Sequence, residues 1–189
     1  MLNLVTDRAG SAPDVLRSLN RKGYFQMTSE ERALWNAGNG GAYDAEDLNR
    51  VEGAVEFLSG ELERVYEAVK DFLAQSGVAD DTFFSIPYKP EDLDFFTKTD
   101  WEQGDDPTPD DVSRFLENVK KICSLIEYNR PPLPNSIERL GIDGANNIEK
   151  SLQGLEVAAV ALEAKRKNQI DRTASSWYYS SEIYGGEAI

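Results

Sequence analysis

Apolar residues recur at alternating steps of three and four between residues 44 and 76. They occupy the a and d positions of a coiled-coil heptad for more than three heptads. Asp44 is a favourable N-cap for this stretch, and Gly77 favours a stop. We therefore expect one long helix, buried against helices of the same chain or of other copies of it. Its core stripe comprises Leu48, Val51, Val55, Leu58, Leu62, Val65, Val69 and Phe72.

Two further long helices follow the same logic. Thr108 is the expected N-cap of one, with Pro109 as its first helical residue and an apolar face that runs to Ile126. The other is expected over residues 143–170, with a cationic tail at residues 165–167 that suits the helix dipole. Between them, residues 130–134 carry three prolines and are predicted to be extended.

Shorter elements precede these helices. A helix is predicted from about Ala12 to a stop at Gly23, and Thr28 with Glu31 forms a capping box that opens a short helix before Gly38. Residues 78–106 are predicted to be a long connection, packed by its aromatic side chains, with one short helix at residues 90–96.

The end of the chain has a different pattern. Residues 175–186 are rich in strand-forming residues without helical periodicity, so we expect a strand or an extended tail there. Exposed aromatic rings are costly on a monomer, which makes this segment a candidate docking surface for a partner. The candidate docking residues are Trp177, Tyr178, Tyr179, Ile183 and Tyr184.

The expected fold is mainly α: a bundle of about three long helices with an N-terminal helical arm and a short C-terminal β segment. The corresponding parts are residues 1–41 (arm), 42–174 (bundle) and 175–189 (aromatic extended segment), forming one domain overall. A hydrophobic share of 40% in 189 residues is enough for a core of this kind.

Composition excludes many functions. The net charge of −14 argues against nucleic-acid binding and against docking on an anionic membrane. The chain has no His, which removes the familiar Ser-His-Asp and Cys-His catalysts, and one Cys, which removes intramolecular disulfides. No apolar run approaches the length of a membrane span, and no signal-peptide core is expected at the start. We expect no catalytic residue, cofactor or metal.

Several residues are candidates for functional sites. Neighbouring carboxylates, at positions 80–81, 92 and 94, 105–106 and 110–111, are expected to be solvated or to cap helices rather than to form a catalytic pair. Residues 100–111 could supply oxygen ligands for calcium, but they lack the EF-hand pattern. Cys123 lies on an apolar stripe and is expected to be buried, and Trp35 and Trp101 are expected to pack in the core or in loops.

The starts of the three long helices resemble one another. Residues 47–51 and 111–115 share an Asp followed three positions later by an Arg, and residues 146–150 carry a related polar start. This similarity can reflect generic capping chemistry. Alternatively, it is a recurring docking pattern in which the Arg faces an acidic partner group.

An ordered set of short motifs along nearly the whole chain resembles a family of small structural proteins from tail modules of Firmicutes phages and prophages. Each motif alone is weak, and the most distinctive is the aromatic ending. In chain order, the motifs lie at residues 20–28, 35, 41–43, 47–52, 99–101, 107–109, 144–149 and 177–187.

The resemblance implies a non-catalytic structural component of a tail or baseplate, made in the host bacterial cytoplasm and located in the virion. Its expected partners are other tail or baseplate proteins and, because virion parts are usually symmetric, further copies of itself. Two other classes stay open. One is a module that binds host-surface saccharides through Trp101 or the C-terminal aromatics, and the other is a cell-wall hydrolase accessory.

Overall fold

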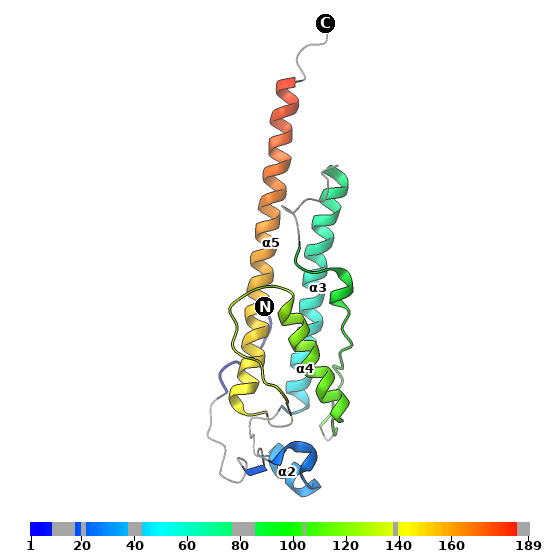
Figure 1. Cartoon of the computed structure of the whole chain (residues 1–189), viewed down its shortest axis with the longest axis vertical. Helices are drawn as coiled ribbons and strands as arrows, with labels where there is room; N and C mark the ends of the chain where they lie inside the picture. Colours follow the sequence, from blue (N-terminus) through cyan, green and yellow to red (C-terminus); the bar gives the residue numbers. More distant parts are fainter. Residues whose placement is uncertain are drawn as a thin grey trace.

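The protein, described here from a computed structural model, is mainly helical (Figure 1). The structure describes residues 1–8, 18–19, 22–37, 43–76, 86–103, 105–137 and 140–184, and only the backbone of residues 35–37, 76 and 176–184. The element order is η1 (Tyr24–Gln26), α2 (Ser29–Ala37), α3 (Ala45–Ser76), η3 (Pro90–Leu93), α4 (Pro109–Ser124) and α5 (Ile142–Tyr184).

Side chains cap the helices where the sequence predicts it. The Thr28 hydroxyl accepts from the Glu31 amide at 3.3 Å, and the Glu31 carboxylate accepts from the Thr28 amide at 2.8 Å. Thr108 and Asp111 form the same reciprocal box at α4. At α3 the Asp44 carboxylate accepts from the Asp47 amide at 2.8 Å. Each cap satisfies amides that the first helical turn leaves without partners.

The three long helices run in the same direction. In Figure 1, α3, α4 and α5 all begin near α2 and run towards the end of the molecule where α5 projects furthest. Parallel helices cannot be joined by short turns, so the chain must return along the bundle between them. Among the described residues, these returns are made by residues 93–101, which belong to the connection predicted at residues 78–106, and by residues 128–137.

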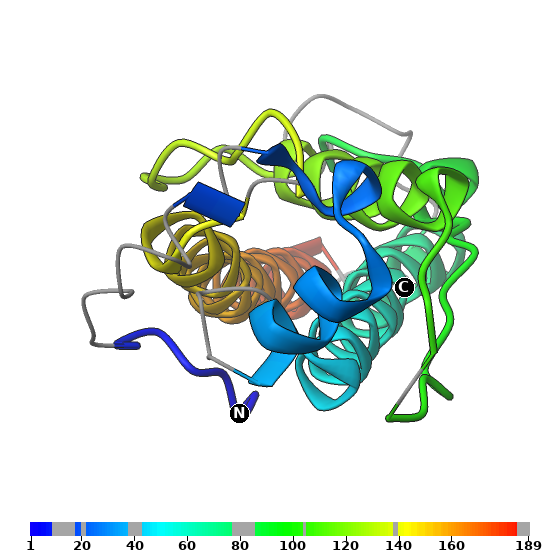
Figure 2. The same cartoon turned by 90° about the horizontal axis from the view of Figure 1, so that it is seen from below.

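Three extended segments return along the bundle, one beside each pair of helices (Figure 2). The leading segment (residues 1–8) lies on α5 and α3, where Leu2, Val5 and Arg8 bond to successively earlier turns of α5. The middle segment (residues 93–101) bonds to α3 and α4, and the third segment (residues 128–137) contacts α4 and α5. The bundle therefore alternates three helices with three extended segments around one core.

The predicted core stripe of α3 faces the other helices. Val51, Leu58 and Leu62 are fully buried, and Phe72 at the far end is half-buried. The cluster continues through Phe115 and Ile122 of α4 and Ile148, Leu152 and Leu155 of α5. Within this single chain, α3 has its most extensive packing against α5.

The C-terminal β segment predicted from the sequence is not observed. Helix α5 continues through the predicted boundary at residue 174 and ends at Tyr184, and the described residues contain no strand. After Gly154 the sequence has no Gly or Pro until Gly185, so nothing interrupts a helix that is already nucleated and packed. The β preference of aromatic residues depends on a sheet to pack against, and none is present in the described parts of the chain.

Of the predicted N-terminal arm (residues 1–41), the structure describes residues 1–8, 18–19 and 22–37, and residues 18–19, 22 and 29–37 are helical. Residues 1–8 are extended and belong to the bundle, whereas η1 and α2 form a small cluster of their own around Leu19, Tyr24 and Met27. Most of the predicted helix from Ala12 lies outside the described residues. Its predicted stop fits the backbone of Gly23, whose φ of 84° favours glycine.

Candidate functional site: paired clamps on α3 and α5

Helix α5 holds the leading segment with an amide and a carboxylate one turn apart. The Asn146 side chain bonds to both backbone groups of Arg8, accepting from its N–H at 3.0 Å and donating to its C=O at 3.1 Å. One turn later, the Glu149 carboxylate accepts from the Val5 amide at 2.5 Å. Further along the helix, Glu156 accepts from the Leu2 amide at 2.9 Å. All of these bonds are made to main-chain groups of an extended peptide.

Helix α3 holds the middle segment in the same way. The Asn49 side chain accepts from the Trp101 N–H at 2.8 Å and donates to the Trp101 C=O at 2.9 Å. One turn later, the Glu52 carboxylate accepts from the Lys98 amide at 2.7 Å. The Trp101 indole N–H also points at Glu52, at 3.5 Å.

The two arrangements are the same clamp. In each, a helix carries an Asn-x-x-Glu pair and an extended segment runs antiparallel to that helix. The Glu bonds to residue n of the segment, and the Asn bonds to residue n+3. The gripped tetrapeptides also share their two central residues, which are Thr-Asp at positions 6–7 and again at 99–100. We name these arrangements the α5 clamp (Asn146 and Glu149) and the α3 clamp (Asn49 and Glu52).

An arginine from a neighbouring helix completes each clamp. Arg50 of α3 bonds to both oxygens of Glu149, at 3.0 and 3.2 Å, and Arg114 of α4 bonds to both oxygens of Glu52, at 2.6 and 3.0 Å. Each arginine lies three residues after the aspartate at its helix start and contacts it. The aspartates cap their helices, as the first interpretation of the similar helix starts predicts. The arginines face acidic groups of this same chain, whereas docking on a partner stays a prediction.

Burial makes the α5 clamp electrostatically strong. Glu149 is fully buried, and Arg8 of the leading segment contacts both Glu149 and Asp47. Burial opposes the charge on Arg8 and Arg50, but the hydrogen bonds to Glu149 and Asp47 prevail and raise the pKa of each guanidinium. Burial, together with the charge of Glu149, raises the pKa of Tyr43 well above its ordinary value. Both guanidinium groups therefore keep their charge at neutral pH.

Two of the candidate residues, Trp101 and Cys123, are buried. Trp101 is 7% exposed, its N–H faces Glu52, and the Lys98 amine lies 3.7 Å from its ring centre. The ring is thus buried, with the Lys98 amine over one face, so it offers no exposed platform for stacking a sugar. Cys123 is also buried, as expected, and burial raises the pKa of its thiol.

The Asp-rich stretch before α4 makes contacts within the chain. Asp106 accepts from the Tyr24 hydroxyl at 2.9 Å and pairs with Arg32, while Asp105 accepts from the Glu102 amide. Asp111 caps α4, and the Thr108 hydroxyl lowers the pKa of its carboxyl. The described residues contain no group of three or more Asp, Glu, Cys or His that could hold a metal ion.

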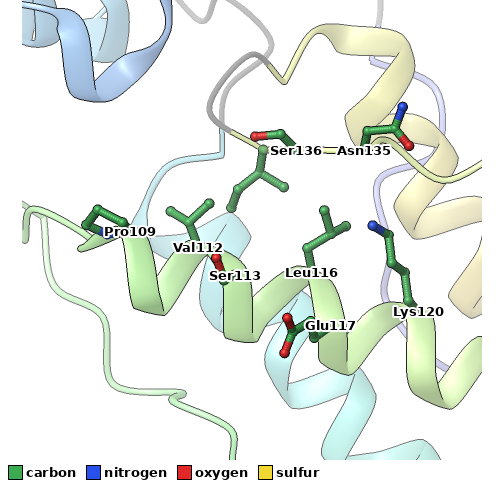
Figure 3. Close-up of a pocket in the computed structure, with 9 residues that line it drawn as sticks. Pro109, Val112, Ser113, Leu116, Glu117, Lys120, Asn135 and Ser136 are labelled. Carbon is green, nitrogen blue, oxygen red and sulfur yellow. The ribbon is translucent and has the colours of Figure 1, made fainter.

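A shallow cavity of about 180 Å³ lies between α4 and the third segment (Figure 3). Val112 and Leu116 form its apolar floor, and polar side chains such as Lys120 and Asn135 form its rim. Ligand pockets usually enclose about 300 to 1,000 Å³. This cavity is smaller, and it is separate from the clamps.

The candidate docking residues at the C-terminus lie on the last turns of α5. Trp177, Tyr178, Tyr179, Ile183 and Tyr184 all fall within the helix, and their side chains lie outside the described part of the structure. They are not brought together with the clamps, which lie at the opposite end of the bundle (Figure 1).

Sequence reasoning identified the arginine starts but missed the Asn-x-x-Glu pairs. The signal was present as two polar pairs of equal spacing beside a buried stripe, together with the repeated Thr-Asp.

None of the helices in the described parts of the chain combines the length and apolar character needed to cross a membrane. No family model matches the chain, and neither the comparison with curated proteins nor that with solved structures finds a significant match.

Proposed function

We propose that the protein is a non-catalytic structural component of a bacteriophage or prophage tail or baseplate, assembling with other tail subunits and with copies of itself. The proposal starts from the resemblance of the ordered sequence motifs to tail-module proteins. It also fits a chain whose buried charges are engaged in holding its own segments.

The observation that carries the proposal is where those motifs lie in space. Residues 47–52, 99–101 and 144–149, three of the motifs, supply both clamps and the segment gripped by one of them. Motifs that are distant in sequence but bond to one another in the structure indicate a family more specifically as a set than each does alone. This supports reading the resemblance as one of fold and role, because the shared residues are those that build the bundle.

The expected docking element is the projecting end of α5. Arg50 pairs with Glu149 and Arg64 with Glu163, so each α3 residue lies beside the α5 residue 99 positions later. This register places residue 175 beside Ser76, where α3 ends. The last turns of α5, with all five candidate docking residues, therefore project past α3 (Figure 1). An amphipathic or aromatic helix end of this kind can pack on a partner subunit.

Mass spectrometry of tail particles from the source bacterium tests the role directly. We expect the protein in the purified particle fraction, in a fixed ratio to the other tail proteins. Its absence from intact particles would refute a virion role. Truncation after Thr173 should leave the unfolding transition of the bundle in place but abolish incorporation into particles. Truncated protein that still assembles would refute docking through the end of α5.

A further inference from the structure

We propose that the α5 clamp, with the groove that continues to Glu156, is a peptide-binding site that accepts the leading segment of a second copy of this chain. Residues 1–8 of one copy would then lie between α3 and α5 of another. This inference rests on the geometry of the clamp and does not depend on the proposed role in a phage tail.

The α5 clamp already holds a segment with the sequence of the proposed ligand. The leading segment is bound as an extended peptide, through main-chain groups of Leu2, Val5 and Arg8 and through the Arg8 guanidinium. Leu2 and Leu4 pack against the core from the same segment. Every described bond from the segment to the rest of the chain goes to Asp47, Asn146, Glu149 or Glu156. An identical segment from another copy satisfies the same groups.

The same recognition occurs at two places in the chain. The α3 clamp binds the Thr-Asp segment at residues 98–101, between η3 and α4, through Asn49 and Glu52. The α5 clamp binds the Thr-Asp segment at residues 5–8 by the same bonds through Asn146 and Glu149. An extended Thr-Asp segment is therefore a ligand that an Asn-x-x-Glu pair of this chain recognises through its main chain.

The charges of the α5 clamp favour a segment that carries an arginine. With the leading segment in place, Arg8 and Arg50 balance Asp47 and Glu149. When the segment leaves, Arg50 remains bonded to both carboxylates, so Glu149 is never left buried without a cation. Asp47 and Glu149 then outnumber Arg50 by one negative charge, and Glu156 adds a second along the same site. The empty site therefore attracts a segment that brings an arginine.

Photo-crosslinking in the full-length chain tests the exchange. Benzoylphenylalanine at Val5, which is 37% exposed, should react within the groove of whichever copy holds the segment. The matched control places the same group at Phe96 in the middle segment, which is 77% exposed and is enclosed by the chain on both sides. We expect a dimer-sized product that increases with protein concentration for the Val5 position, and only intrachain product for Phe96.

Two additions identify the site. A synthetic peptide of residues 1–8 in excess should suppress the Val5 dimer product, and the same peptide with Arg8→Ala should suppress it far less. Combining Asn146→Ala with the Val5 label should abolish the dimer product. Crosslinks that remain intrachain at every concentration would overturn the proposal. So would a Val5 dimer product that the peptide and Asn146→Ala leave unchanged, because the contact would then lie elsewhere.

Discussion

The guanidinium of Arg64 on α3 bonds to the Glu163 carboxylate on α5 at 2.7 and 3.0 Å, two heptads beyond the bond between Arg50 and Glu149. Both arginines also contact an acid three residues earlier on their own helix. The repeat of 14 residues on both helices is the signature of a parallel coiled-coil pair in constant register. The two pairs differ in burial, because Glu149 is fully buried whereas Arg64 and Glu163 are about half exposed.

This difference predicts unequal effects of the same substitution. Arg50→Met should lower the free energy of unfolding by about 2 to 4 kcal/mol, because Glu149 remains buried with Arg8 as its one remaining cation. Arg64→Met should cost less than about 0.5 kcal/mol, because its partner can be hydrated. Urea denaturation of both variants at neutral pH measures the two values. Equal costs would contradict the assignment of Arg50 as the buried partner.

The two clamps predict a matched pair of effects. Asn49→Ala and Asn146→Ala each remove two hydrogen bonds to one backbone unit and should each cost about 1 to 3 kcal/mol. Asn118→Ala is the control, since Asn118 donates one exposed bond to the Phe96 carbonyl. Its expected cost is below about 0.5 kcal/mol. Thermal unfolding of the three variants checks the order.

A clear asymmetry between the two clamp variants would be informative. If Asn49→Ala is costly and Asn146→Ala is nearly neutral, the leading segment contributes little to the stability of the folded chain. That outcome would contradict the equivalence of the clamps as folding elements.

The sequence predicts the helices well where local chemistry decides them. The caps at Thr28, Asp44 and Thr108 and the stripe on α3 depend on neighbours within a few residues, and the structure has helices at those positions. Parallel packing of the helices follows less directly, from connections too long for hairpin turns. The pairing of Asn146 with Arg8 cannot be predicted this way, because it joins residues 138 positions apart.

At the C-terminal segment, by contrast, the prediction from local sequence is wrong. Trp177 and its aromatic neighbours favour strands on average, but the chain reaches them inside a helix that Leu152 and Leu155 have anchored in the core. Continuing a helix needs no nucleation, so tertiary context overrides a weak local preference. The burial of the clamp glutamates is not predicted either, because a glutamate side chain is most often exposed.

Glycines in the long helices provide a test of packing. A Cβ at Gly154 would lie 2.9 Å from the Tyr128 ring, whereas a Cβ at Gly53 or Gly60 meets nothing within 4 Å. Gly53→Ala and Gly60→Ala should each stabilise the protein by about 0.5 to 1 kcal/mol through helix propensity. Gly154→Ala should destabilise it by about 1 kcal/mol or more, because the ring must move and its hydroxyl bonds to the Ser151 carbonyl.

Chemical denaturation of the three glycine variants measures these signs. Stabilisation by Gly154→Ala would show that the Tyr128 ring is not held against α5. Destabilisation by Gly53→Ala would show that this face of α3 is covered in the folded protein in solution.

Alkaline pH should weaken the fold through Tyr88. Burial raises the pKa of this phenol to about 12, and its hydroxyl donates to the Leu62 carbonyl at 3.0 Å. The unfolded chain loses the same proton near its ordinary pKa of about 10, so the folded state binds more protons between about pH 10 and 12. The free energy of unfolding contributed by Tyr88 is therefore complete below about pH 10 and is lost as the pH rises through this window.

The variant Tyr88→Phe isolates this contribution. It should be less stable by about 1 kcal/mol at pH 8, because the hydrogen bond to Leu62 is missing. Between pH 9 and 11 it should lose about 1 kcal/mol less than the parent protein, because it has no phenol to titrate at this position. Tyr43 and Tyr128, whose pKa values burial also raises, are present in both proteins and cancel in the difference. Parallel pH profiles for the two proteins, measured by urea denaturation, would show that the phenol of Tyr88 is hydrated and that the groove beside Leu62 is open to water.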